Sequence, residues 1–216
     1  MQFQVRDGCE TEKSRSMRKN YSESLAVIFV LVFFLAGCAT GGTVEPSFET
    51  AGKKIVFVPF RERDLYCFES RLGMQVSALL ATVVSKMSEE LKVVDVAPAA
   101  ALIEGKDPDK IDWQEVGRTT GADYVVLGFI KILRARDPLD VNCYKGVFEA
   151  EIAVIQTATG EEVMGEDISV TYPSGRFEQE FLSVLETTED KVLEKVKEHG
   201  VKKMAEFFYP HPPPDE

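Results

Sequence analysis

Residues 122–130, with the sequence ADYVVLGFI, restrict the fold most, because they are apolar or β-branched over almost their whole length. A strand with one face in water alternates apolar and polar residues, whereas a strand covered on both faces is nearly continuous in apolar residues. The sequence therefore predicts a central strand over 122–130 that continues to Arg134 and needs a cover on both sides. A loop around Asp137 and Pro138 is expected to end it.

The segments around this strand predict a mixed sheet. Short apolar runs indicate strands, apolar residues at helical spacing indicate helices, and Asp112 and Gly121 are typical of the two ends of one helix. The expected elements are strands at 55–58 and 93–96, helices at 72–91, 98–104 and between Asp112 and Gly121, a hairpin at 147–157 and 163–171, and a main helix at 190–208. Right-handed crossovers make the first three strands parallel. The expected fold class is α/β (α+β), a mixed sheet of about five strands, three parallel plus an antiparallel hairpin, flanked by helices.

The amino-terminal part has the order of a secretory signal. Basic residues, the apolar run 25–34 and then Leu35-Ala36-Gly37-Cys38 follow one another. The last four residues resemble the lipobox of bacterial lipoproteins, in which the cysteine is acylated and the cleaved chain begins there. The resemblance implies a signal peptide over 1–37, with Met17 as the expected start, and a diacylglycerol and an N-acyl lipid on Cys38. The alternatives are a plain signal peptide or a retained membrane helix, and the second is disfavoured because a span needs about 20 apolar residues.

Cleavage before Cys38 would leave 179 residues, enough for one domain with a proper core. We expect a lipidated tether over 38–52, the domain over 53–208 and a disordered tail over 209–216. Residues 38–216 contain 20 basic and 32 acidic residues, so their net charge is −12. Such a charge repels nucleic acid and anionic headgroups. Nucleic acid is therefore excluded as a partner, and attachment to the membrane must come from the lipid.

Four stretches resemble one family: KIVFVPF at 54–60, VVD at 93–95, GADYVVLG at 121–128 and TGEEV at 159–163. They are similar to the CsgG/TolB-N-like lipoprotein superfamily, which includes curli-secretion lipoproteins, penicillin-binding-protein activator lipoproteins and the amino-terminal domain of TolB. The resemblance implies a periplasmic, non-enzymatic domain that binds other envelope proteins in assembly or secretion. The extra hairpins of curli-type members and the long tether of the activators are not matched, so neither specific activity is expected. The oligomeric state is left open.

The residue after Cys38 bears on location. It is Ala39 and not Asp, and by the enterobacterial sorting rule this favours the outer membrane, with the domain facing the periplasm.

Catalytic motifs are missing from the sequence. There is no P-loop, GxGxxG, HExxH, GxSxG or paired CxxC pattern. His199 beside Gly200 is typical of a helix end, and His211 lies in the tail. Asp107, Asp109 and Asp112 could suggest calcium, but a solvated loop explains their spacing better. We therefore expect no enzyme, no metal and no cofactor besides the lipid on Cys38.

Two cysteines besides Cys38 are expected in the exported chain, Cys67 and Cys143. An even pair in an oxidising compartment favours a disulfide. Cys67 follows the first predicted strand and Cys143 the third, and parallel strands place these ends on one side of the sheet. The closed loop would contribute about 4 kcal/mol as an upper estimate. Two free thiols are the alternative.

The same predicted edge collects arginines, which are favoured with tyrosine at protein interfaces. The expected partner-binding face consists of Arg61, Arg63, Tyr66, Arg71, Arg134 and Arg136. The alternative is that these arginines pair with nearby acids and only solvate the edge. If replacing Arg63, Tyr66 and Arg136 left partner capture undiminished, the site would move to the exposed Glu149 and Glu151 face of the hairpin. A second function, binding a small ligand or glycan in a pocket at the sheet edge, also remains open. An apolar cleft ringed by polar groups would favour it, and a flat polar-aromatic face would favour protein binding.

Overall fold

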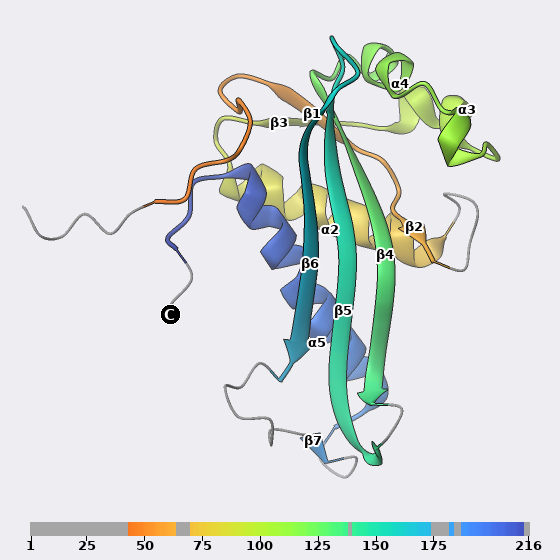
Figure 1. The fold of residues 1–216 in the computed structure, drawn as a ribbon, viewed down its shortest axis with the longest axis vertical. Helices are drawn as coiled ribbons and strands as arrows, with labels where there is room; N and C mark the ends of the chain where they lie inside the picture. Colours follow the sequence, from red (N-terminus) through yellow and green to blue (C-terminus); the bar gives the residue numbers. More distant parts are fainter. Residues whose placement is uncertain (1–42, 64–69, 138–139, 174–181, 184–186, 214–216) are drawn as a thin grey trace, which may run out of the picture. The chain divides into compact units, whose positions relative to one another are not determined.

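The sheet is mixed, as the sequence predicts. In the computed structural model its strand order is β3-β1-β4-β5-β6, with β2 beside β4 and β7 beside β5 (Figure 1). Strands β1, β3 and β4 are parallel, whereas β5 pairs antiparallel with both β4 and β6. Helices flank the sheet, so the expected α+β class is confirmed. The structure describes residues 43–63, 70–137, 140–173, 182–183 and 187–213.

The elements follow the predicted order. Their bounds are β1 Lys54–Phe57, β2 Arg61–Glu62, α2 Arg71–Met87, β3 Lys92–Val94, η1 Ala97–Ala99, α3 Ala100–Ile103, η2 Pro108–Lys110, α4 Trp113–Thr120, β4 Tyr124–Asp137, β5 Asp140–Gln156, β6 Glu162–Tyr172, β7 Leu182–Ser183, α5 Glu189–Ala205 and η3 Glu206–Phe208. Residues 43–211 form one compact unit. No helix within the described ranges is long and apolar enough to cross a membrane.

The β4–β5 hairpin is longer than the sequence predicts. Strand β4 runs to Asp137 instead of Arg134, and β5 begins at Asp140 instead of 147. The extension has its own small core, in which Ala135 and Tyr144 pack with Val192 of α5. This contact joins segments far apart in the sequence and stabilises the end of the hairpin. Cys143 and Arg136 therefore lie within strands and not in a loop.

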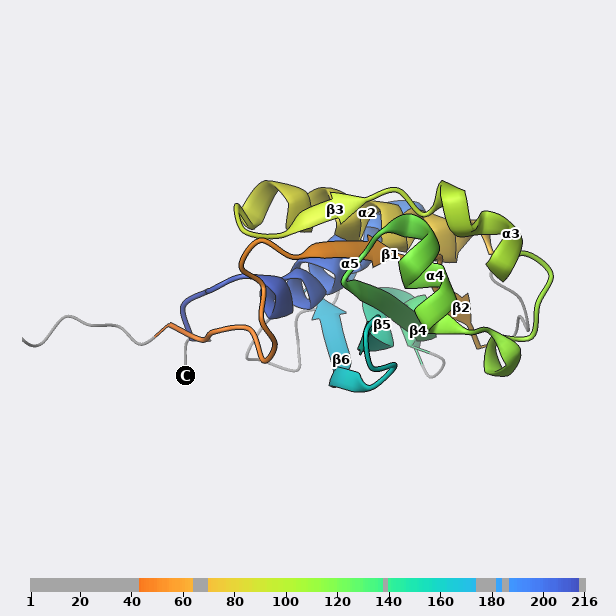
Figure 2. The same cartoon turned by 90° about the horizontal axis from the view of Figure 1, so that it is seen from above.

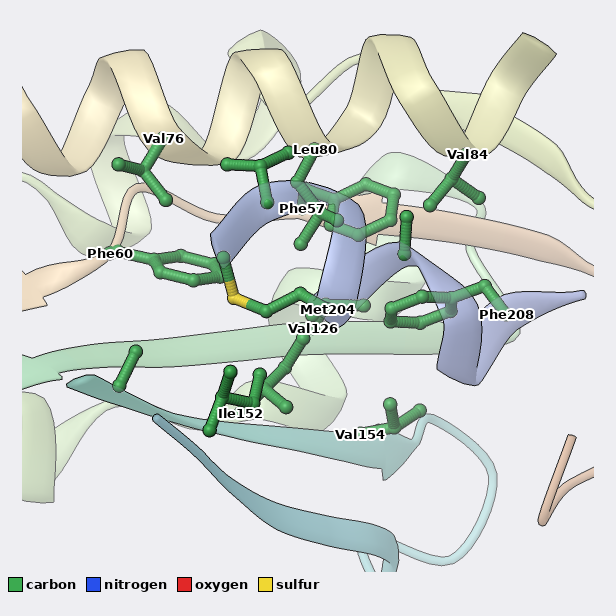
Figure 3. Packing of buried hydrophobic residues seen from close by; sticks show 14 of the residues in the cluster. Phe57, Phe60, Val76, Leu80, Val84, Val126, Ile152, Val154, Met204 and Phe208 are labelled. Atoms are coloured by element: carbon green, nitrogen blue, oxygen red, sulfur yellow. The ribbon is translucent and has the colours of Figure 1, made fainter. Parts of the chain in front are cut away.

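Two hydrophobic layers hold the sheet. The larger lies between one face and helices α2 and α5, and Figure 3 shows Phe57, Phe60, Met204 and Phe208 inside it. The smaller lies on the opposite face, where Val56 and Val125 meet Ile103 of α3 and Val116 of α4. The run 122–130 is thus covered on both sides over its first half only, because α3 and α4 lie near the start of β4 (Figures 1 and 2).

Helix α4 has the predicted ends. The Asp112 side chain accepts hydrogen bonds from the backbone N–H groups of Gln114 and Glu115, at 2.9 and 3.1 Å. Gly121 follows the helix in the left-handed region, at φ 69°. Both signals act locally, which is why the sequence located them.

Helix α5 passes through Gly200 without a break, so His199 is not at a helix end as expected. Gly200 is buried, and a Cβ there would lie 2.3 Å from Cδ1 of Phe148 on β5. The glycine therefore allows close packing of the helix on the sheet. His199 is half-buried, and its ring stands edge-on to Tyr172 at 5.3 Å.

The ends of the folded unit are more ordered than the predicted tether and tail. Val44 and His211 exchange two backbone hydrogen bonds, of 2.8 and 3.1 Å. The Phe48 ring lies 5.0 Å from that of Tyr124 and 5.9 Å from that of Phe208. Segment 43–52 and the start of the tail thus belong to the fold, because an aromatic residue and a strand-like bridge attach them to the core.

Candidate functional site

The sheet leaves part of one face uncovered. Helices α2 and α5 pack on the opposite face of β4, β5 and β6, and Figure 1 shows both behind these strands. On the near face, α3 and α4 cover β1, β3, the start of β4 and the end of β5. Within the described residues, the near face of β4, β5 and β6 is uncovered beyond these helices. There, Phe129 of β4 lies opposite Glu151 of β5, which lies opposite Asp167 of β6. We call this surface the open face.

A hollow of about 420 Å³ lies on the open face. Its floor contains the half-buried side chains of Leu127, Phe129 and Ala153, and the half-buried Trp113 of α4 lies at one side. Six structural elements contribute to it. The complete lining is Arg61, Asp109, Trp113, Leu127, Gly128, Phe129, Glu151, Ile152, Ala153, Glu162, Gly165, Glu166 and Asp167.

The lining of this hollow is acidic. The lining residues include five acidic ones, of which Glu166 pairs with Ile152 and so has its side chain toward the other face, and one cation, Arg61. The Arg61 guanidinium lies 5.5 Å from the centre of the Phe129 ring. A cation over an aromatic face is weakly attractive and holds the ring in place as part of the floor. The excess of carboxylates makes the hollow more attractive to basic groups than to acidic ones.

Lys131 connects two of these carboxylates across three strands. Its Nζ lies 2.5 Å from Glu151 Oε1 and 2.5 Å from Asp167 Oδ1. The hydrogen bonds that Lys131 donates to Asp167 and then to Glu151 raise the pKa of Lys131 above its ordinary value. A lysine whose pKa is higher in the folded than in the unfolded protein stabilises the folded state fully at a pH below the unfolded pKa. This stabilisation is lost as the pH rises through the folded pKa. The cation therefore remains in place throughout the physiological range.

The structure does not bring all the predicted arginines together. Arg61 lies in the open-face hollow, Arg63 follows it with its N–H bonded to the Ile130 carbonyl, and Arg71 is exposed at the start of α2. Arg61 is level with Phe129 on β4, whereas Arg136 is seven residues farther on, about 23 Å at the usual rise of a strand. Tyr66 lies outside the described residues.

Arg136 has partners at the far end of the hairpin. Its Nε lies 3.3 Å from Glu189 Oε2 of α5, and its Nη2 donates to the Tyr144 hydroxyl at 3.0 Å. The guanidinium also lies 4.8 Å from the centre of the Tyr144 ring. These contacts attach the hairpin to α5. Arg134 is exposed on the same part of β4.

The cysteine predictions stay predictions. Cys38, Cys67 and the side chain of Cys143 lie outside what the structure describes, and the backbone of Cys143 pairs with Ser183 of β7. Neither the lipid on Cys38 nor the disulfide between Cys67 and Cys143 is tested by the fold.

Sequence reasoning largely missed the hollow. Of the lining residues, the sequence analysis named two as candidates for the interface: Arg61, in the expected partner-binding face, and Glu151, in the alternative Glu149 and Glu151 face. The available signal was the alternation of Leu127, Phe129 and Lys131, which in a strand places these side chains on one face. Matching them to Ala153 and Glu151 requires the register of the hairpin, which the sequence does not provide.

No protein-family model and no curated protein sequence matches this chain. Several solved structures are distantly similar to it in fold. The PelC dodecamer from Paraburkholderia phytofirmans is 15% identical, with a TM-score of 0.47 over 77% of this chain and 94% of that one. Lipoprotein GNA1162 from Neisseria meningitidis is 14% identical, with a TM-score of 0.44 over 71% and 98%. The LpoB C-terminal domain from Escherichia coli is 14% identical, with a TM-score of 0.38 over 56% and 84%. At these values no partner or residue role carries over to this chain.

Proposed function

We propose that this protein is a lipid-anchored lipoprotein of the bacterial cell envelope, of the CsgG/TolB-N-like kind, that works without catalysis by binding another envelope protein on its open face. The lipobox ending at Cys38 supports the anchor, and Ala39 favours the outer membrane with the domain facing the periplasm. The observation that carries the binding role is the uncovered sheet face, where Leu127 and Phe129 form part of the floor of the hollow and Trp113 lies at its side, among acidic residues. Aromatic residues on an otherwise polar surface are typical of protein interfaces.

The exposure of the lining favours a protein over a small ligand or glycan. The volume of the hollow falls in the range of ligand pockets, but such pockets enclose most of the ligand surface. Here the side chains of Glu151 and Asp167 are 53% and 75% exposed. A small ligand would remain largely in solvent on this surface, whereas a protein could cover the hollow and its surroundings together.

Site-specific photocrosslinking in the native host tests this function. A photoreactive phenylalanine analogue would replace Ser169, which is exposed on β6 and level with Glu149. Matched probes would replace Thr82, exposed on α2, and Arg134, exposed on the hairpin end. We expect one defined adduct at Ser169, at least tenfold more abundant than at Thr82. Its protein component, once identified and purified, should bind the purified lipoprotein directly.

The three probes give different outcomes. Equal adducts at all positions, or none at Ser169, would contradict an interface on the open face. An adduct confined to Arg134 would place the interface at the hairpin arginines that the sequence favoured.

A further inference from the structure

Strand β6 is a long free edge of the sheet. It pairs with β5 along one side, from Tyr172 opposite Gly146 to Glu162 opposite Ile155. Within the described ranges, no strand pairs with its other side (Figure 1). The other edge strand, β3, has three residues, whereas β6 has 11. An edge of this length presents a row of backbone N–H and C=O groups that a further strand can bind.

The charges on β6 disfavour a second copy of this chain as that strand. Asp167 is the middle residue of β6, so two copies paired antiparallel about their centres would place one Asp167 opposite the other. Like charges directly opposite across strands are destabilising. Glu162 and Glu166 add to the negative charge of the same edge.

The same charges favour a basic strand. Across the open face, Lys131 of β4 contacts Glu151 of β5 and Asp167 of β6, so the row of charges begins with a cation and ends at the edge with a carboxylate. Asp167 is 75% exposed. A lysine or arginine on an added strand, opposite Asp167, would place a second cation on the outer side of these two carboxylates. Opposite charges in such cross-strand pairs are stabilising.

We propose that β6 binds an extended, lysine- or arginine-bearing segment of the partner protein as an added strand. The backbone of the segment bonds the free edge, and its basic side chains lie on the open face beside Asp167 and the acidic hollow. This inference rests on the proposed function in one respect, that the partner is a protein, and it adds the chemistry of the segment that is bound.

The test uses a peptide as the probe and the full protein, purified from membranes in detergent. A fluorescent nine-residue peptide alternates valine and lysine, and its binding is followed by anisotropy at 150 mM salt. Two further peptides have the same sequence and charge. One carries N-methyl groups on the odd-numbered residues, and the other carries them on the even-numbered residues. Only one set of amides in an added strand faces β6. We therefore expect one N-methylated peptide to bind at least tenfold more weakly than the unmodified peptide, and the other to bind comparably.

A charge variant completes the test. Asp167→Lys should weaken binding of the unmodified peptide at least tenfold. Glu104→Lys, an equal charge change at an exposed position after α3, should weaken it less than twofold. Equal binding of both N-methylated peptides would overturn the added strand, as would no binding of the unmodified peptide. Equal effects of the two lysine variants would overturn the role of Asp167.

Failure of this inference can be separated from failure of the proposed function. If the Ser169 probe captures a defined partner while the two N-methylated peptides bind alike, only the added strand is wrong. If the N-methylated peptides differ as expected but no open-face probe captures a protein in the host, the function is wrong.

Discussion

A Cys38→Ala variant is expected to move from the membrane fraction to the soluble fraction almost completely. Each buried methylene of an acyl chain contributes about 0.8 kcal/mol to membrane binding, and two or more chains give stable anchoring. Without them, a chain with a net charge of −12 over residues 38–216 has no electrostatic attraction to anionic lipid. Cell fractionation measures the shift. Labelling with radioactive palmitate should mark the protein that keeps Cys38 and should not mark the Cys38→Ala variant.

Thr40→Ala is the matched control, because Thr40 lies in the same expected tether two residues after Cys38 and is not the residue that the lipobox predicts to be acylated. It should leave both the distribution and the labelling unchanged. A Cys38→Ala protein that stays in the membrane would show that the apolar run 25–34 can act as an anchor, and an unlabelled parent protein in the same experiment would show that Cys38 is not lipidated. Density-gradient separation of the two membranes in the same preparations tests the outer-membrane assignment.

Gly73→Ala is expected to lower the free energy of unfolding by about 3 kcal/mol, at the upper end of what overpacking costs. Gly73 lies in the first turn of α2 and is buried, and a Cβ there would lie 1.8 Å from the Phe60 carbonyl oxygen. The obstacle is backbone, which cannot rotate away as a side chain can. The Phe60 N–H also bonds the Gly73 carbonyl at 3.2 Å, so moving the helix away would weaken this bond too.

Equilibrium unfolding in urea measures the effect, and Met74→Ala provides the control. Met74 is the next residue of the same helix and is 47% exposed. Its replacement should change the free energy by less than about 0.5 kcal/mol, as surface substitutions usually do. A Gly73→Ala protein as stable as the parent would mean that α2 can shift away from Phe60 at little cost.

The fold was predictable where the signals were local. Asp112 and Gly121 mark the ends of α4 through hydrogen bonds and a backbone conformation that depend on adjacent residues. The ends of the β4–β5 hairpin were not predictable in this way. The hairpin extends to Asp137 because Ala135 and Tyr144 meet Val192, a residue about fifty positions later in the chain. Gly200 likewise suggested a helix end at His199, whereas the glycine lies within α5 because Phe148 leaves no room for a Cβ there.

The candidate site was less predictable than the fold. Reasoning from strand ends placed all the arginines at one edge, but the register sets Arg61 level with Phe129 and leaves Arg136 at the far end of the hairpin. The hollow depends on which residues of β4, β5 and β6 lie opposite one another. A bulge near Lys131 shifts this pairing by one residue, between Ile130 and Ile132, so the partners of the residues beyond it cannot be read from alternation alone. No pattern within a single strand contains that information.

The bridge between Val44 and His211 brings the two ends of the folded unit together. They meet as paired backbone, so a short peptide could join them without disturbing the sheet. A new start could then be made at the turn around Gly160, between β5 and β6, because circular permutation succeeds where ends are close and the cut is exposed. An attachment point after His211 would likewise lie beside one before Val44. A lipid at either end would therefore hold the domain by the same corner.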